Sequence, residues 1–173
     1  YTEALDFLEL PTAVYTNNHA GVYHHYFQHY IKRGVALELL DPQLRSFDLE
    51  KLGKALLPER DQQFTYLSLQ TLYDRYFLHA DDVRFELPQA FFMRIAMGLA
   101  QQESNKEDRA IEFYQLLSSF DYMASTPTLF NAGTLRPQLS SCFLTTVADD
   151  LDQIYSAIKD KYFRGIAPHA LAC

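Results

Sequence analysis

The feature that most constrains the fold is a helical spacing of apolar residues, which recurs from the start of the chain to about residue 120. From His19 onward, pairs of apolar side chains return four positions apart, which places them on one face of an amphipathic helix. The pairs are Val22 and Tyr23, Tyr26 and Phe27, and Tyr30 and Ile31. Gly34 is suited to end this helix. The pattern predicts a helix over residues 19–34 with this face inward.

Three more stripes predict longer helices. Their expected buried faces are Tyr66, Leu69, Leu72, Tyr73, Tyr76 and Phe77 in residues 62–78; Phe91, Phe92, Ile95, Ala96 and Leu99 after Pro88; and Ala110, Phe113, Tyr114, Leu117 and Phe120 after Asn105. We expect the tyrosines of the first stripe to bury their rings and keep their hydroxyls at the rim, in preference to a radical or binding role. Short helices are predicted before Pro11 and after Asp48, and a polar turn over residues 79–84.

Histidines cluster in the first predicted helix. His25 and His29 have the i, i+4 spacing of a helical metal-binding pair. A structural zinc site needs three or four ligands, and no acidic third ligand lies at a matching offset. A solvated or interfacial histidine face is therefore favoured over a metal site, and we predict no metal.

Composition narrows the class of protein. The 173 residues are 48% hydrophobic, which fits one domain with a real core. A formal net charge of -7 gives no broad basic field for nucleic acid or anionic membrane, so neither is expected as a partner. The sequence shows no apolar run of about 20 residues and no signal-like start. Together with only two cysteines, this predicts a cytoplasmic protein in a reducing compartment.

The helical pattern breaks at residues 125–133. Pro127 disfavours a helix interior and pushes Thr126 towards an extended conformation, which predicts a polar loop. Asn131, Ala132 and Gly133 then read as a turn. Hydroxyls beside unpaired N–H groups would suit a phosphate, although a plain surface turn has the same composition and is favoured by local sequence alone.

A β-strand is predicted over residues 139–147. It contains Cys142 and, after this cysteine, the β-branched residues Thr145, Thr146 and Val147. A lone cysteine in such a strand is more often packed and inert than reactive. Asp149 and Asp150 then stand where a further helix should begin. Capping of exposed N–H groups is a sufficient role for these carboxylates.

These residues carry a family resemblance. The run STPTLFNAGTLRPQLSSCFLTTVADDLDQIY resembles the start of the catalytic domain in the large (alpha) subunit of class I ribonucleoside-diphosphate reductase. The runs ELPQAFFMRIAMGLA and RAIEFYQLLSSFDYM resemble the helical domain of that subunit, and the likeness covers roughly residues 10–160. It implies a mainly α fold: a helical domain over 1–120, then a loop, one or two short strands and a helix over 121–160 from the start of a ten-stranded α/β barrel. Residues 161–173 read as a divergent tail.

The resemblance also implies roles for particular residues. Thr126, Ser141 and Cys142 would bind the ribonucleoside diphosphate substrate, and Cys142 would be one sulfur of a redox-active disulfide. Asp149, Asp150 and Leu151 would bind a dNTP or ATP effector. No cofactor would bind this chain directly, because the radical would come from a dimetal small subunit. A second large subunit and thioredoxin or glutaredoxin would be further partners.

Several elements of the family pattern have no counterpart in this sequence. The partner of Cys142 is missing, since the surroundings of Cys173 match none of the family's cysteine contexts. One cysteine cannot both start a radical and form a disulfide, so we expect this chain alone to be inactive in deoxyribonucleotide synthesis. The alternative interpretation is a non-catalytic helical interaction module or a defective remnant.

Overall fold

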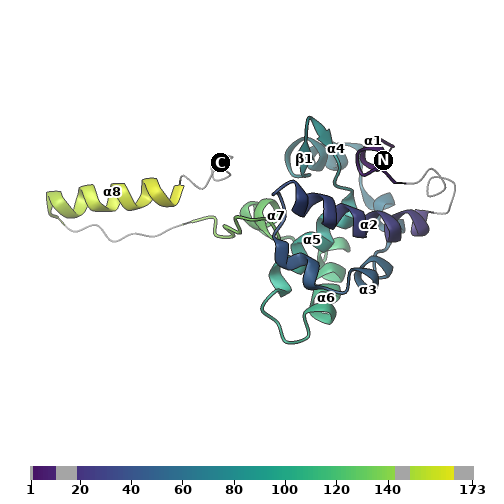
Figure 1. The fold of residues 1–173 in the computed structure, drawn as a ribbon. Helices are drawn as coiled ribbons and strands as arrows, with labels where there is room; N and C mark the ends of the chain where they lie inside the picture. Colours follow the sequence, from purple (N-terminus) through teal and green to yellow (C-terminus); the bar gives the residue numbers. More distant parts are fainter. Residues whose placement is uncertain (1, 11–18, 143–148, 166–173) are drawn as a thin grey trace.

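The computed structural model of the chain describes residues 2–10, 19–142 and 149–165. Its elements, in order, are α1 (Thr2–Phe7), α2 (His19–Ala36), the 3-10 helix η2 (Pro42–Ser46), α3 (Leu49–Lys54), the 3-10 helix η3 (Pro58–Gln63), α4 (Tyr66–Arg75), β1 (His79–Ala80), β2 (Val83–Arg84), α5 (Pro88–Ala100), α6 (Lys106–Ser118), α7 (Thr126–Asn131) and α8 (Leu151–Gly165). Helices α1 to α7 form a body, and α8 lies apart from it (Figure 1). The predicted mainly helical class is confirmed.

Helix α5 lies in the middle of the body (Figure 1). Every residue from Pro88 to Met97 is buried, and α6 is its most extensive helical neighbour. A helix that is apolar on all sides needs neighbours all round, which explains the central position. The predicted buried face is confirmed for four of its residues, but Leu99 is 37% exposed.

Helix α2 packs across this centre with the predicted face. All six paired residues from Val22 to Ile31 are buried. The predicted end at Gly34 is wrong, because the helix continues to Ala36. A Cβ at Gly34 would lie 2.5 Å from Leu40 Cδ1, so this glycine permits a close approach of the returning chain.

The region from Asp48 to Arg75 differs more from expectation. Asp48 caps α3 as predicted, its side chain accepting from Lys51 N. The helix predicted over 62–78 is shorter, because η3 occupies Pro58–Gln63 and Thr65 caps α4. Tyr66 is 83% exposed and Leu69 and Tyr73 are each 38% exposed, so the expected burial of these three side chains is wrong.

The predicted polar turn at residues 79–84 is a β-hairpin. His79 pairs with Arg84 and Ala80 with Val83 in antiparallel register. Asp81 and Asp82 both have positive φ angles, 49° and 62°. Two such residues make the tight turn that matches the twist of paired strands, and aspartate tolerates this conformation better than most residues.

Helices α6 and α7 flank a bend in the chain. Helix α6 ends at Ser118, before Phe120, which is 41% exposed rather than buried as predicted. The predicted loop around Thr126 is wrong, since Thr126 begins α7. Pro127 lies in the first turn of this helix, where a missing N–H breaks no helical hydrogen bond. The predicted turn at Asn131–Gly133 is confirmed, and Gly133 has a φ of +76°.

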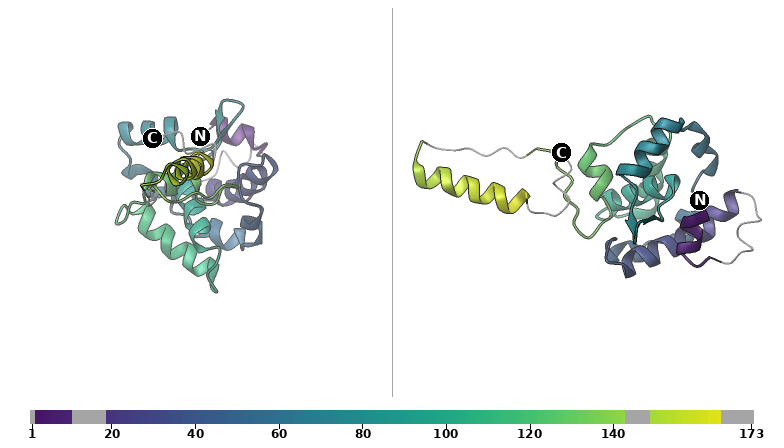
Figure 2. Two further views of the ribbon diagram at one scale, coloured as in Figure 1. Left: turned by 90° about the vertical axis from the view of Figure 1, so that its left-hand side faces the viewer. Right: turned by 90° about the horizontal axis from the view of Figure 1, so that it is seen from above.

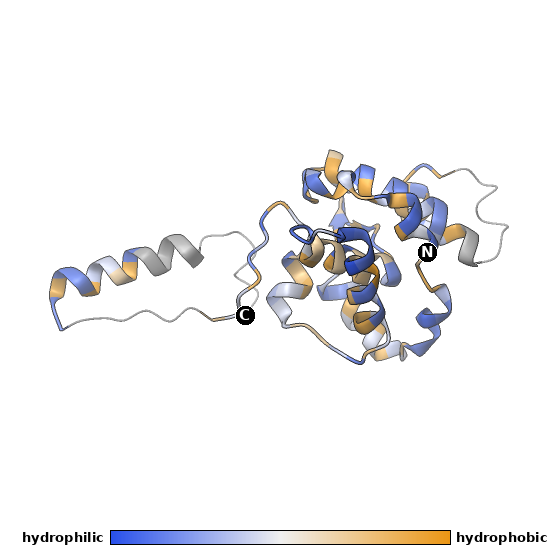
Figure 3. Ribbon diagram, turned by 90° about the horizontal axis from the view of Figure 1, so that it is seen from below, coloured by the Kyte–Doolittle hydropathy of each residue, from blue (hydrophilic) through white to orange (hydrophobic). Residues whose placement is uncertain are grey.

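The last described segments are the least packed. Residues 139–142 form no strand, which corrects that part of the predicted strand over 139–147, and 143–147 lie outside the described residues. The right-hand view of Figure 2 also shows α8 apart from the body. Apolar and hydrophilic residues alternate along its described part (Figure 3). Leu151, Tyr155 and Ile158 are between 57% and 68% exposed.

In the parts of the chain that the structure describes, no helix combines the length and apolar character needed to cross a membrane.

Candidate functional site

The predicted substrate residues lie on α7 and on the chain that follows it. Thr126, at the start of α7, is exposed. Thr128 Oγ1 donates to the Leu139 carbonyl over 3.3 Å, and Asn131 Nδ2 donates to the Gln138 carbonyl over 2.7 Å. These two bonds hold the returning chain beside α7. The segment that leads to Ser141 and Cys142 therefore lies next to the helix that begins with Thr126.

Cys142 carries an exposed, free thiol. The only polar neighbour of its sulfur that the described residues provide is Ser141 Oγ, at 3.9 Å, the long limit for a hydrogen bond to sulfur. Exposure makes the thiol accessible to a reaction partner. Ser141 is exposed as well.

The predicted effector residues stand at the start of α8. Asp149, Asp150 and Leu151 are exposed. Asp150 Oδ2 accepts from Gln153 N at 3.4 Å, and the Asp150 carbonyl accepts from Ile154 N at 3.0 Å. Asp150 therefore caps α8, which confirms the capping role for this residue. Residues 143–148, between the substrate and effector groups, lie outside the described part of the chain.

The histidine pair of α2 makes a local contact. His29 Nδ1 lies 2.9 Å from the His25 carbonyl oxygen, and the ring donates this bond in the tautomer with a proton on Nδ1. Among the described residues there is no group of three or more His, Cys, Asp or Glu side chains placed to hold a metal ion.

A buried charged group, absent from the sequence-based predictions, lies behind α7. We call it the Tyr30–Glu86–Arg94 cluster. Arg94 Nε donates to Glu86 Oε1 over 2.7 Å and Arg94 Nη2 to Glu86 Oε2 over 3.3 Å, with both side chains fully buried. The Tyr30 hydroxyl donates to Glu86 Oε1, and Leu78 N donates to Glu86 Oε2. The carboxylate thus receives donors from α5, from α2 and from the segment between α4 and β1.

Burial and charge in this cluster shift the pKa values of Tyr30 and Arg94. Burial and the neighbouring Glu86 carboxylate raise the pKa of the Tyr30 hydroxyl well above its ordinary value. Burial acts to lower the pKa of Arg94, but the charge of Glu86 opposes this and the net pKa shift is upward. Both shifts favour a neutral tyrosine beside a charged ion pair. In the sequence, the signal for this buried ion pair is the presence of one glutamate and one arginine in the otherwise mostly apolar run ELPQAFFMRIAMGLA.

A second buried polar group surrounds Gln89. Its amide nitrogen donates to Asp61 Oδ1 and its amide oxygen accepts from the Tyr114 hydroxyl, each over 2.7 Å. Leu57 N in turn donates to the Tyr114 oxygen over 2.9 Å. Burial raises the pKa of Tyr114 to about 12. This network joins α5 to α6 and to the chain between α3 and η3.

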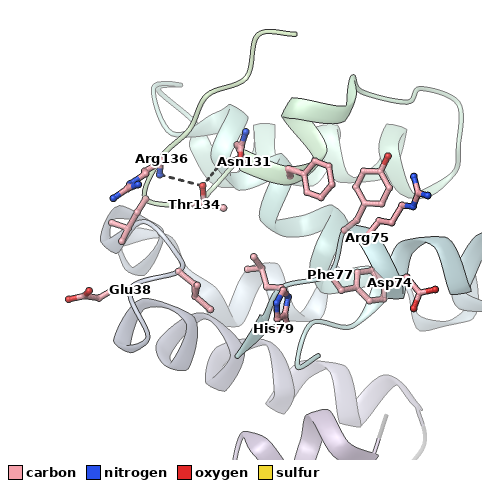
Figure 4. Close-up of a pocket in the computed structure, with 13 residues that line it drawn as sticks. Glu38, Asp74, Arg75, Phe77, His79, Asn131, Thr134 and Arg136 are labelled. Carbon is pink, nitrogen blue, oxygen red and sulfur yellow. Dashed lines mark hydrogen bonds between the residues drawn. The ribbon is translucent and has the colours of Figure 1, made fainter. Parts of the chain in front are cut away.

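A cavity of about 520 Å³ lies between α4, the end of α2 and the chain after α7. Figure 4 shows Glu38 and Arg136 at one end and Asp74 and Arg75 at the other, with His79 between them. The Tyr76 and Phe130 rings, which also line it, stack with centroids 4.6 Å apart. Its charged residues lie at the ends and its apolar ones between.

Comparisons with known proteins identify the family to which these helices belong. Residues 62–137, which include α4 to α7 and Arg94, match the family described as "Ribonucleotide reductase, all-alpha domain". The chain is 52% identical over 140 residues to the ribonucleoside-diphosphate reductase subunit alpha of Chlamydia muridarum, covering 80% of this chain and 13% of that protein. By this likeness the chain belongs to the ribonucleotide reductase large-subunit family.

More distant members agree. The subunit alpha of Helicobacter pylori strain 26695 is 44% identical over 147 residues, covering 82% of this chain and 18% of that protein. The large subunit of monkeypox virus is 41% identical over 111 residues, covering 64% of this chain and 14% of that protein. The chain thus spans less than a fifth of the length of these relatives.

Proposed function

We propose that the chain serves in a class I ribonucleoside-diphosphate reductase, as part of the large subunit that reduces ribonucleoside diphosphates to 2'-deoxyribonucleoside diphosphates for DNA synthesis. The observation that carries the proposal is the 52% identity over 140 residues to a protein named as such a subunit. The match of residues 62–137 to the all-alpha domain supports it independently. The site of action is proposed to be the cytoplasm.

The proposed reaction uses a pair of thiols. Two thiols lose two electrons and two protons and close a disulfide. One proton leaves with the 2'-hydroxyl as water, and the two electrons and the other proton form the C2'–H bond that replaces the broken C–O bond. We propose that Cys142 is one of these thiols and that its partner comes from sequence that the relatives carry beyond the matched stretch. Thr126 and Ser141 would hold the substrate. The exposure of all three side chains supports this assignment.

The remaining proposals concern partner proteins and an effector nucleotide. A dimetal small subunit would supply the radical, a second large subunit would complete a dimer, and thioredoxin or glutaredoxin would reduce the disulfide again. Asp149, Asp150 and Leu151 would contact a dNTP or ATP effector. A carboxylate that is not fully used by capping can accept from the sugar hydroxyl of such a ligand.

A chimera tests the proposal. The stretch of this chain that matches the Chlamydia muridarum subunit would replace its counterpart there, and CDP reduction would be assayed with a small subunit and a dithiol. We expect turnover in the chimera and none from the 173-residue chain alone. Cys142→Ser in the chimera should reduce turnover by at least about a thousandfold, because the reducing disulfide can no longer form.

Ser140→Ala is the matched control, since this exposed neighbour of the reactive segment has no proposed role. It should keep turnover within about twofold of the unsubstituted chimera. Full turnover in Cys142→Ser would exclude the redox role of that cysteine. An inactive but folded unsubstituted chimera would favour a non-catalytic interaction module.

A further inference from the structure

The α7 segment, which we define as residues 126–135, carries Thr126 at one end and is held from the interior at the other. The last carbonyls of a helix have no partners within it and need donors from elsewhere. In α7 the Thr128 and Asn131 carbonyls accept from Ala132 N and Thr134 N, and the other donors come from Arg94 on the neighbouring helix α5. Arg94 Nη1 donates to the Ala132 carbonyl over 2.7 Å and Nη2 donates to the Leu129 carbonyl over 3.2 Å.

A third bond, from Arg94 Nη1 to the Phe130 carbonyl at 3.4 Å, completes this contact. Figure 1 shows α7 beside α5, the helix that bears Arg94. A guanidinium is planar and its donors have fixed directions, so it constrains the position of its acceptors more than a lysine ammonium would. Its positive charge also suits the carboxyl end of a helix.

The Tyr30–Glu86–Arg94 cluster fixes the guanidinium itself. Two donors of Arg94 bind the Glu86 carboxylate, so the plane of the group cannot rotate without breaking this ion pair. Tyr30 from α2 and Leu78 N hold the carboxylate from the other side. The position of α7 is thus tied to α5, to α2 and to the segment between α4 and β1.

Backbone contacts fix the end of the α7 segment in the same place. A Cβ on Gly98 would lie 2.2 Å from Gly133 N, so α5 touches the turn directly. The Gly133 carbonyl accepts from Asp41 N at 3.0 Å, and Thr134 forms a bridge with Leu40. These contacts hold the turn against α5 and against the chain at Leu40 and Asp41.

We infer that Arg94, fixed by Glu86 and Tyr30, is the positioning residue that sets where the α7 segment presents Thr126 to the diphosphate of a ribonucleotide. The inference rests on the proposed function for the role of Thr126, and on the structure for the role of Arg94. Arg94 touches no substrate in this scheme, because it is fully buried behind the segment. It acts only through the carbonyls that it holds.

Amide hydrogen exchange of the full 173-residue chain, followed by NMR, tests the inference. The probes are the amides of Leu129, Ala132 and Thr134, which bond to Ser125, Thr128 and Asn131 within the segment. In the double variant Glu86→Gln/Arg94→Met, which removes both charges together, we expect these amides to exchange at least about tenfold faster relative to those of α6. Equal acceleration in α6 and α7 would overturn the inference.

Two single substitutions serve as matched controls. Tyr23→Phe removes a tyrosine hydroxyl from α2, the helix that also bears Tyr30, but this hydroxyl donates to Asp61 and not to Glu86, so the exchange ratio should stay within about threefold of the unsubstituted chain. Arg94→Lys keeps the charge and folds with the ion pair in place, and should restore part of the protection lost in the double variant. An α7 exchange ratio in Arg94→Lys identical to that of the unsubstituted chain would show that the guanidinium geometry is not required.

Titration with CDP separates this inference from the proposed function. In the unsubstituted chain we expect CDP to shift the NMR signals of the Thr126 and Thr128 amides. In Arg94→Lys we expect the same shift to require a CDP concentration at least about fivefold higher. An equal CDP requirement in the two chains would count against positioning. Signals unmoved in the unsubstituted chain would count against the substrate role of Thr126, while the exchange ratios would still decide the role of Arg94.

Discussion

The body formed by α1 to α7 and the single helix α8 bury their side chains to very different extents. In the body, even Arg94 and Glu86 are fully buried and have several hydrogen-bond partners. In α8, Leu151 is 68% exposed, although it is apolar. Because most helical stability in proteins comes from packing of an apolar face, substitutions should cost much more stability in the body than in α8.

The largest expected effect comes from breaking the ion pair of the body. Arg94→Leu leaves the Glu86 carboxylate buried without its counter-charge, and the carbonyls of α7 without their donors. We expect the free energy of unfolding to fall by about 3–5 kcal/mol, measured by urea denaturation followed by circular dichroism. A loss under about 1 kcal/mol would mean that water reaches this group and that the body is less closed than described.

Alkaline pH should weaken the body through Tyr114. Its folded pKa of about 12 lies above the ordinary value of 10.0, so the folded state holds the proton more tightly than the unfolded state. The contribution is complete below pH 10 and is lost as the pH rises towards 12. Between these values, we expect the free energy of unfolding to fall by up to about 1.4 kcal/mol per pH unit from this group.

Tyr114→Phe identifies this contribution. The variant should be less stable at neutral pH, because Leu57 N and Gln89 lose a partner, but its stability should fall less steeply above pH 10. The measurement is urea denaturation at several pH values for both proteins. Parallel pH profiles would assign the alkaline effect to other groups, Tyr30 among them.

A smaller effect is expected at the contact between α5 and the turn after α7. Gly98→Ala places a methyl group within 2.2 Å of Gly133 N, and backbone cannot yield as a flexible side chain does. We expect a loss of about 1–3 kcal/mol in a thermal melt, with Gly53→Ala as a matched control in another helix. A Cβ at Gly53 would lie 3.2 Å from its nearest neighbour, His24 Nδ1, so this control should cost less.

The smallest effect should come from α8. Tyr155 is 66% exposed, so Tyr155→Ser should change the free energy of unfolding of the body by less than about 0.5 kcal/mol. Urea denaturation monitored by the near-ultraviolet signal of the buried tyrosines reports on the body alone. A loss above about 1 kcal/mol would show that α8 packs on the body and would remove the contrast between the two regions.

The sequence predicted the parts of this fold that depend on local spacing. The stripes of α2 and α5 and the cap at Asp48 follow from periodicity and side-chain chemistry over a few residues. The hairpin at 79–84 was missed because a pair of aspartates in the left-handed conformation replaces the usual asparagine and glycine of such a turn. The helix start at Thr126 was missed because proline excludes a helix interior but not a first turn.

The candidate site likewise contains residues that the sequence identified and one residue that it did not. A family resemblance selected Thr126, Ser141, Cys142 and Asp149, and these side chains are exposed in the structure. Arg94 was not predictable, because the carbonyls that it binds lie 35 to 38 positions further along the chain. The cooperation of such distant groups depends on the packing of α5 against α7, and no local pattern encodes it.

The bridge between Leu40 and Thr134 also bears on how the chain folds during synthesis. It joins residues 40 and 134, which are far apart along the chain, so a long loop must close before this contact forms. Contacts of such long range slow folding relative to the local formation of helices. A ribosome must therefore release the end of α7 before the earlier helices can complete their shared core, and until then α5 would present apolar surface to chaperones.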